Sequence, residues 1–269
     1  SGLYITNANS VNLDRISIIS SNAQYGGGIC WFSINNANGT LIVKSSFIDN
    51  NSAIGGGGIY LEGLDRFELY NSIISNNTVS QDGGGLDLRS DTSIIVNSTI
   101  VSNEAGAGRY GAGIHFCCSN FHHHAIINSI IFGNYLYNSP YQNNIALASG
   151  SVYAHNNYVG VLGNSAFGFS LVEDQNNLGL NTSPFVDISN NDFNLNNTTS
   201  AIGGGVNSVQ IFGETISTLN YDYNNLARPT PALSPPDIGA FESIYSSSDV
   251  GCIDTLACNY DANAIIDDG

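Results

Sequence analysis

The stretch FIDNNSAIGGGGI, residues 47–59, contains the two motifs that decide the fold of this chain. A short apolar segment ends in asparagines, and a run of glycines then leads into the next apolar segment. The apolar residues that follow four such glycine runs are 30, 27 and 28 residues apart: Ile29, Ile59, Leu86 and Ile114. A period of this length is typical of a solenoid, in which each repeat forms one turn.

A second set of residues keeps the same period independently. Each member is an asparagine that stands five residues after a serine and three residues after a large apolar residue. The members are Asn22, Asn50, Asn77, Asn103 and Asn134. We expect these asparagines to stack in one column at a corner of the solenoid and to exchange side-chain hydrogen bonds, as amides do in other stacked sheets.

Each repeat holds about three short apolar segments separated by Gly, Asn and Asp. One repeat cannot bury its apolar face alone, but stacked repeats can. Helix formers are scarce and no window has helical periodicity, which excludes a helical bundle and a doubly wound α/β fold. The sequence therefore predicts an all-β right-handed parallel β-helix with a small C-terminal module rich in Cys and Asp.

The composition limits the partners of the chain. Only 10% of its 269 residues are charged, and 22 Asp and Glu against 6 Lys and Arg give a net charge of -16. Nucleic acid and an anionic membrane surface repel such a chain, and no apolar stretch is long enough for membrane insertion. There is no Met, and the chain begins inside a strand-like pattern, which indicates a piece of a longer protein.

The paired motifs of residues 47–59 resemble the repeats of polymorphic outer-membrane passenger proteins and of large bacterial surface β-helices. This resemblance covers roughly residues 1–160. It implies a fold rather than an activity, because the same scaffold carries lyases, adhesins and spacers.

The segments SPFV at 183–186, DFNL at 192–195 and DIGAFE at 237–242 resemble the C-terminal rungs of secreted bacterial β-helix proteins of the choice-of-anchor Q type. The chain departs from that pattern where Pro is missing after Ser200 and where Gly203 replaces the usual Asp. The resemblance implies a helix terminus with a cap. We therefore divide the chain into regular rungs at 1–175, terminal rungs with a cap at 176–245, a polar linker at 246–250 and a tail module at 251–269.

The tail GCIDTLACNYDANAIIDDG, residues 251–269, resembles the short Cys- and Asp-rich modules of secreted marine Bacteroidota proteins, and it stops just before the Ser-Cys that ends those modules. The resemblance implies an extracellular location reached by type IX secretion, and disulfide partners for Cys252 and Cys258. Carboxylate and amide oxygens are the ligands that Ca²⁺ prefers. The candidate calcium ligands are Asp254, Asp261, Asn263, Asp267 and Asp268.

Alternation along the strand after each glycine run sends one set of side chains outward on consecutive rungs. This candidate ligand face consists of Tyr60, Glu62, Asp87, Arg89 and His115. A polysaccharide lyase needs a cation, often Ca²⁺ held by carboxylates, and a basic residue, for which Glu62, Asp87 and Arg89 form a minimal catalytic set. Two outward carboxylates would also suit glycoside hydrolysis. The alternative is a salt-bridged, solvated face.

Cysteine and histidine residues suggest further chemistry in the same region. Stacking separates Cys30 from Cys117 by about 14 Å, which is too far for a disulfide, so we expect Cys117 and Cys118 to be packing thiols. Imidazoles at 122–124 suit Zn²⁺ or Cu²⁺, but strand alternation keeps all three from binding one ion.

Two classes of function fit these observations. The first is an extracellular cell-surface adhesin, stalk or filament segment within a much larger secreted protein, whose partners are a cell-surface glycan or protein, or further copies joined at the rod ends. The second is a secreted polysaccharide-degrading enzyme, a pectate-lyase-like uronate lyase. The early rungs are short and offer no long loop over the candidate face before residue 135, which favours the first class.

Overall fold

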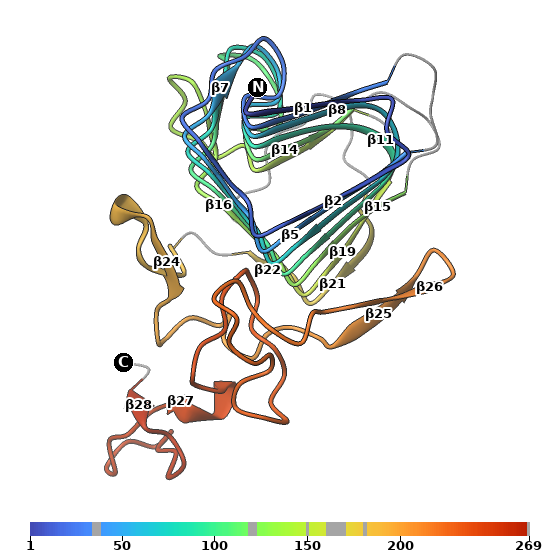
Figure 1. Cartoon of the computed structure of the whole chain (residues 1–269). Coiled ribbons are helices and arrows are strands. Elements are labelled where there is room, and N and C mark those ends of the chain that lie inside the picture. Colours follow the sequence, from blue (N-terminus) through green and yellow to red (C-terminus); the bar gives the residue numbers. More distant parts are fainter. Residues whose placement is uncertain (34–38, 118–122, 149–150, 160–170, 180–181, 268–269) are drawn as a thin grey trace.

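A computed structural model describes residues 1–33, 39–117, 123–148, 151–159, 171–179 and 182–267. Within these ranges the chain is all-β apart from two short 3-10 helices, η1 (Ile188–Asn190) and η2 (Ser247–Asp249). Neither of these helices has the length or apolar character to cross a membrane. The chain winds as a solenoid whose successive turns pair through parallel strands (Figure 1).

Three strand positions recur from turn to turn and form three faces (Figure 1). The first face contains β1 (Leu3–Thr6), β4 (Ile29–Phe32), the start of β8 (Ile59–Tyr70), the start of β11 (Leu86–Val96), β14 (Ile114–Phe116) and β18 (Ile145–Leu147). The second contains β2 (Ser10–Asp14), β5 (Thr40–Lys44), the ends of β8 and β11, β15 (His123–Ile127), β19 (Ser151–His155) and β21 (Leu171–Gln175). The third contains β3 (Ser17–Ile19), β6 (Phe47–Asp49), β9 (Ile73–Ser75), β12 (Thr99–Val101), β16 (Ile130–Phe132), β20 (Tyr158–Val159) and β22 (Leu178–Gly179).

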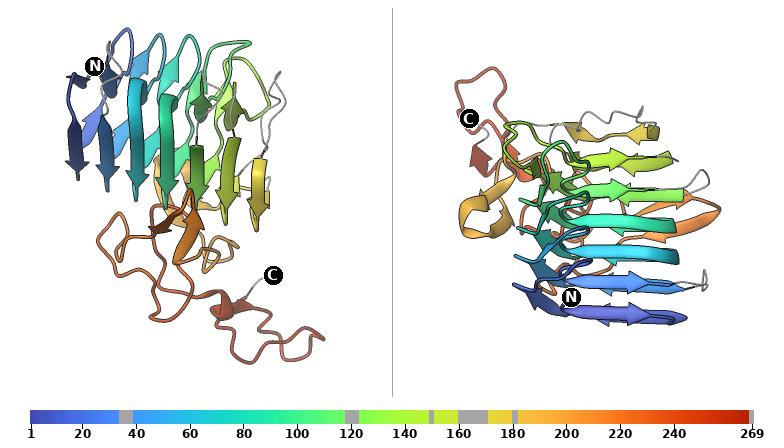
Figure 2. Two further views of the ribbon diagram at one scale, coloured as in Figure 1. Left: turned by 90° about the vertical axis from the view of Figure 1, so that its right-hand side faces the viewer. Right: turned by 90° about the horizontal axis from the view of Figure 1, so that it is seen from above.

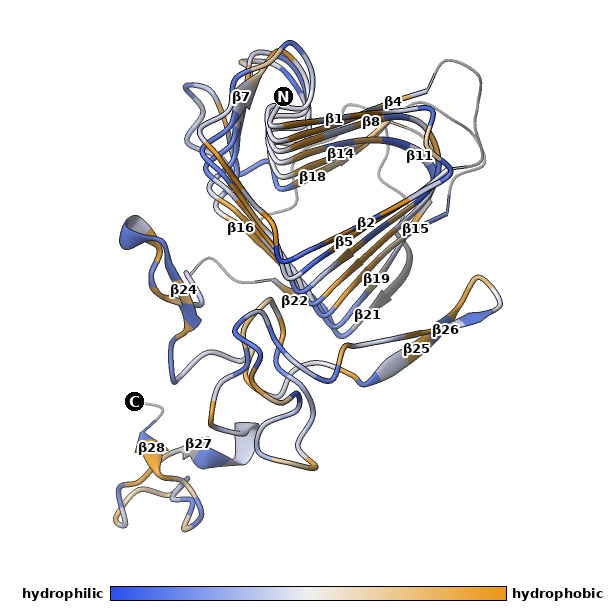
Figure 3. Cartoon of the chain, viewed as in Figure 1, coloured by the Kyte–Doolittle hydropathy of each residue, from blue (hydrophilic) through white to orange (hydrophobic). Residues whose placement is uncertain are grey.

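Seen from the N-terminal end, the chain turns clockwise as it recedes from the viewer (Figure 1). The solenoid is therefore right-handed, and the predicted parallel β-helix is confirmed. Apolar residues occupy corresponding strand positions from rung to rung (Figure 3). The residues after the glycine runs, from Ile29 to Ile114, stack in register and are fully buried in one core.

An excursion that we call the arm joins the third face of one rung to the first face of the next (Figure 1). It contains a parallel sheet of β7 (Ser52–Ala53), β10 (Thr78–Val79), β13 (Glu104–Ala105) and β17 (Tyr135–Leu136), and after β7, β10 and β13 it returns through a glycine run. Gly56 has a φ of +61°, which favours glycine. A Cβ on Gly57 would lie 2.4 Å from the Gly84 carbonyl oxygen, and one on Gly58 would lie 2.6 Å from that of Gly85. Steric constraints thus favour glycine at positions 56, 57 and 58.

A column of asparagines runs along the corner between the third face and the arm. The Nδ2 of Asn77 donates to the Oδ1 of Asn103 at 3.0 Å, and the Nδ2 of Asn103 donates to the Oδ1 of Asn134 at 2.9 Å. Toward the N-terminus the column continues through Asn51, whose Nδ2 donates to Asn77 at 3.0 Å, and then through Ser21. The column therefore contains three of the five predicted asparagines.

The predicted positions of Asn22 and Asn50 are wrong by one residue. Asn22 donates to the Ser52 hydroxyl, and Asn50 donates to the Ser20 hydroxyl, both beside the column. Two serines at 45–46 are followed by two asparagines at 50–51, so the five-residue spacing from serine to asparagine fits either Asn50 or Asn51. The apolar core decides which of the two joins the column. Ile48 points inward against Ile74, whereas the predicted register would have placed its neighbour Phe47 there. A shift of one residue exchanges the two faces of a strand.

We predict that Asn77→Ala destabilises the solenoid by about 1–3 kcal/mol. Asn77 is fully buried, and its amide also donates to the Ile48 carbonyl and accepts from the Asn51 backbone N–H. Alanine leaves these groups without a partner in a region closed to water. Chemical denaturation measures the loss, with the exposed Asn197→Ala as the matched control. Equal stability of the two variants would show that the column contributes little.

Residues 182–245, which we call the strap, do not form the predicted terminal rungs. The last described rung ends with β22 at Gly179, and the strap runs back beside several rungs (Figure 2). It contains the hairpins β23 (Phe185–Asp187)–β24 (Asp192–Leu195) and β25 (Ser208–Ile211)–β26 (Glu214–Ser217). The tail follows with β27 (Val250–Gly251) and β28 (Ile266–Asp267).

The strap covers apolar side chains that the second and third faces turn outward. Ile238, Ala240 and Phe241 pack in one cluster with outward residues of the third face such as Ile130. The hairpin β25–β26 packs on the second face through a cluster that includes Ile216. Apolar outer faces favour a lateral cover, because a cap on the end of the solenoid would leave them in water.

A second asparagine column holds the strap at the corner between the second and third faces. Its members have φ values between 45° and 50°, and their side-chain amides donate to strap carbonyls: Asn71 to Tyr221, Asn97 to Asp237, Asn128 to Val206 and Asn156 to Gly204. The sequence signal for this column is an asparagine directly before the polar residue that precedes the third-face strands from β9 onward, whereas β3 and β6 have Arg15 and Ser45 at this position. Only the asparagines after those strands were singled out in the sequence.

Candidate functional site

The five residues of the predicted ligand face come together as one polar cluster. Tyr60, Asp87 and His115 are register partners on consecutive rungs, and Glu62 pairs with Arg89 in the same way. The Nδ1 of His115 lies 3.0 Å from Oδ1 of Asp87, and Nη2 of Arg89 lies 3.4 Å from Oδ2 of the same carboxylate. The Tyr60 hydroxyl donates to Glu62, and the Arg89 guanidinium lies 5.1 Å from the centroid of the Tyr60 ring.

Three members of the cluster are covered, which corrects the expectation of a fully open outer face, whereas Glu62 and Arg89 are partly exposed. Asp87 is 1% exposed, and Tyr60 and His115 are also buried. The glycine runs of the arm return directly over these side chains. A Cβ on Gly56 would lie 2.7 Å from the Cβ of Tyr60, and one on Gly83 would lie 2.5 Å from the Cβ of Asp87. Alternation gave the direction of the side chains correctly but could not show what lies above them.

The charged side chains of the cluster pair with groups inside the cluster. Both oxygens of Asp87 have cationic or imidazole partners, so neither is free to hold a cation. Burial, assisted by the hydrogen bond to Glu62, raises the pKa of Tyr60, which stays a neutral donor. Burial works to lower the pKa of Arg89, but Asp87, Tyr60 and Glu62 raise it, and the net shift is upward. A guanidinium held in its charged form is a poor general base.

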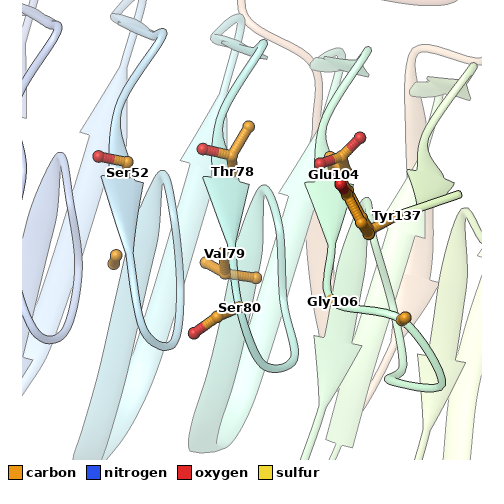
Figure 4. A pocket seen from close by; sticks show the side chains of 9 residues that line it. Ser52, Thr78, Val79, Ser80, Glu104, Gly106 and Tyr137 are labelled. Carbon is orange, nitrogen blue, oxygen red and sulfur yellow. The ribbon is translucent and has the colours of Figure 1, made fainter.

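A groove on the outer side of the arm was not predicted from the sequence. Ser52, Thr78 and Glu104 form one row of register partners on three successive rungs. Tyr137 and Ser80 lie farther along the arm, and the hollow between these side chains has a volume of about 420 Å³ (Figure 4). The strands of the arm are two residues long, too short to give a periodic signal.

The histidines and the disulfide lie elsewhere on the first and second faces. His124 is buried and stacks on Phe116 with ring centroids 4.3 Å apart, while the exposed His123 contacts Phe212. Cys117 is disulfide-bonded, so the prediction that it is a packing thiol is wrong. The stacking distance argued only against Cys30 as its partner, and Cys30 is a free thiol. Cys118 and His122 lie outside the described residues.

Among the described residues of the tail, the predicted carboxylate ligands of calcium do not form one group. Asp254 accepts from the backbone N–H of Leu256, and Asp261 accepts from the backbone and the side chain of Asn263. Asp267 lies in β28, and Asp268 lies outside the described residues. In the described ranges, no three His, Cys, Asp or Glu residues lie close enough to hold a metal ion, and calcium binding stays a prediction.

The tail cysteines also differ from their expectation. Cys252 and Cys258 are free thiols, although disulfide partners were expected for both. The other described cysteines offer no partner, because Cys30 is buried in the first face and Cys117 is already bonded.

Comparison with protein-family models, with curated proteins and with solved structures finds no match to this chain. The site must therefore be interpreted from its own geometry.

Proposed function

We propose that the chain is an extracellular cell-surface β-helix that acts as an adhesin, stalk or filament segment within a larger secreted protein. The observation that supports this most strongly is that Tyr60, Asp87 and His115 are buried beneath the glycine runs, and that the charged groups of the cluster pair with one another. Stacked cores and an unbroken asparagine column favour a stiff rod. A stiff rod suits a role in spacing and presentation. The secretion route and tail calcium remain part of this proposal.

The alternative is a Ca²⁺-dependent uronate lyase, supported by the juxtaposition of Glu62, Asp87 and Arg89 in one cluster. Such an enzyme requires a carboxylate that can reach the cation and an arginine that can lose a proton. Asp87 is engaged through both oxygens, and the pKa of Arg89 is raised. The lyase would therefore need Asp87 to break its contacts with His115 and Arg89.

The two proposals are separated by incubating the purified chain with uronate polymers and Ca²⁺ and recording the absorbance of the unsaturated product. We expect no product, and we expect binding of the labelled chain to cells or to a glycan surface. Product that disappears in Arg89→Ala but persists in the exposed control Arg109→Ala would establish the lyase instead. Product unchanged in both variants would indicate an enzyme with another site.

Association at the ends of the rod is a further part of this proposal. In the described part of the chain, β1, β2 and β3 each pair with a neighbour on one side only. Their apolar residues Val11, Leu13 and Ile18 pack on the core but are only partly buried. Unpaired strand edges of this kind favour pairing with another chain. We expect a sedimentation coefficient that rises with protein concentration, and a single monomeric species at all concentrations would contradict this.

A further inference from the structure

We propose that the groove of the arm binds a neutral oligosaccharide. This inference rests on the proposed adhesive function and names its ligand class. The groove, which we call the arm groove, is lined chiefly by Ser52, Thr78, Ser80, Glu104, Gly106 and Tyr137 (Figure 4).

The position of the arm groove leaves it accessible. The strap packs on the outer sides of the second and third faces, and the glycine runs of the arm close over the polar cluster of the first. The strap lies on the opposite side of the solenoid from β7 (Figure 1). Thr78, Ser80 and Tyr137 are exposed, so a ligand reaches the groove without any rearrangement of the fold.

The first row of the groove offers hydrogen-bonding groups at regular intervals. Parallel pairing places Ser52, Thr78 and Glu104 about 4.8 Å apart from rung to rung. The Ser52 oxygen accepts from Asn22 at 2.8 Å, which leaves its hydroxyl proton to donate elsewhere. In the described part of the chain, the Thr78 hydroxyl and the Glu104 carboxylate have no hydrogen-bond partner. The row therefore offers donors and acceptors to the hydroxyl groups of a sugar chain.

The second row of the groove consists of Ser80, Gly106 and Tyr137, and it provides the hollow and an apolar wall. Gly106 stands between Ser80 and Tyr137, and a Cβ there would lie 2.1 Å from the Ser80 carbonyl oxygen. The glycine therefore lets the backbones of two neighbouring rungs come close together in the lining of the groove. The Tyr137 side chain is 54% exposed. An exposed aromatic ring presents an apolar face with a polar hydroxyl tip, and it matches the C–H face of a pyranose ring.

Charge and size narrow the class of ligand. Glu104 is the charged residue that lines the groove, and the whole chain carries a net charge of -16. Both repel a uronate polymer, so the groove favours neutral hexose or N-acetylhexosamine units. A volume of about 420 Å³ falls within the roughly 300–1,000 Å³ of small-ligand sites, which suits a short oligosaccharide segment.

The test applies the full chain to a printed panel of neutral hexose, N-acetylhexosamine and uronate oligosaccharides, and then measures affinity for the neutral ones by calorimetry. We expect binding to neutral glycans, weakened about tenfold or more by Tyr137→Ala and by Glu104→Gln. The matched control is Tyr141→Ala, since Tyr141 is 76% exposed and lies outside the groove lining. Tyr137 and Tyr141 are exposed and Glu104 is partly buried, and circular dichroism confirms that each variant is folded.

Binding to uronate oligosaccharides alone would overturn the ligand class. Binding to neutral glycans that neither Tyr137→Ala nor Glu104→Gln weakens would overturn the site while leaving the adhesive function intact. An absence of glycan binding would overturn this inference. The cell-binding assay above then decides separately whether the chain is adhesive at all.

Discussion

Replacing Arg228 with methionine is expected to lower the free energy of unfolding of the strap by about 3–5 kcal/mol. The Arg228 side chain is fully buried, and its Nε lies 3.2 Å from the Glu242 carboxylate. Its Nη1 and Nη2 also donate to the Gly239 carbonyl. Removing the cation leaves Glu242, Asp237 and Asp222 as buried acids without a buried counter-charge.

The backbone around Arg228 explains why these acids cannot move to solvent. Asp237 accepts from the backbone N–H groups of Gly203 and Ser243, and Asp222 accepts from those of Leu226 and Glu242. The carboxylates thus bind together loops that have no regular secondary structure of their own. Loss of the arginine should release the strap as a unit while the solenoid stays folded.

The pH dependence of this effect has a definite sign. Burial raises the pKa of Glu242 to about 7, against an ordinary value of 4.5, even with Arg228 present. Without the cation this pKa should rise further. A group whose pKa is raised on folding favours the folded state at low pH, and this stability is lost as the pH rises through the folded pKa. The difference between the variant and the wild type in the free energy of unfolding of the strap should therefore be larger at pH 8 than at pH 5.

Limited proteolysis and hydrogen exchange of the strap measure this prediction. The exposed Arg109→Met is the matched control for loss of one positive charge. The double variant Arg228→Met/Glu242→Gln should recover part of the loss, because it also removes one buried carboxylate. Equal protection of the strap in Arg228→Met and in Arg109→Met would show that the buried charges do not hold it.

Phe67→Ala is expected to destabilise the solenoid by about 3–5 kcal/mol. Phe67 is 0% exposed and lies on β8, between Leu41 on one neighbouring rung and Ser93 on the other. Truncation removes the apolar contacts and leaves a cavity that stacked backbones on both sides keep from collapsing. Each rung contacts only its neighbours, so the loss weakens two interfaces at once.

Denaturant unfolding measures the effect of Phe67→Ala against Phe212→Ala. Phe212 is only partly buried and packs on side chains of the second face, so its loss should cost less. A cost below about 1 kcal/mol for Phe67→Ala would mean that the rung repacks around the gap, as loosely packed cores do.

The sequence predicted the solenoid because its strongest signals report contacts between adjacent rungs. Ile29, Ile59 and Leu86 stack as their spacing indicated, and the direction of Tyr60 and Asp87 followed from simple alternation. The register of the strands was harder to predict, because adjacent serines and adjacent asparagines fit the same five-residue spacing in two ways. Only the burial of Ile48 distinguishes Asn51 from Asn50 as the member of the column.

Features that depend on contacts between distant segments could not be predicted in this way. The strap reaches the corner asparagines across 48 to 150 positions of the sequence, and no local pattern encodes that approach. The burial of the polar cluster could not be predicted either. A glycine run in the sequence indicates that backbones come close together, but it does not indicate which side chains lie beneath them. The arm groove was not predicted either, because it is lined by two-residue strands and by Gly106, and neither gives a periodic signal.

The two asparagine columns place different limits on how the length of this protein can change during evolution. In the first column each amide bonds within its own turn or to the turns directly beside it, so a duplicated turn would reproduce every bond that it interrupts. The second column fastens the strap at Asn71, Asn97, Asn128 and Asn156, one point on each of four consecutive turns. A turn gained or lost within that span would move every later asparagine of the column away from its hydrogen-bond partner in the strap. We therefore expect insertions and deletions of whole turns among homologues to fall before Asn71, where the strap makes fewer bonds and the rod is free to lengthen.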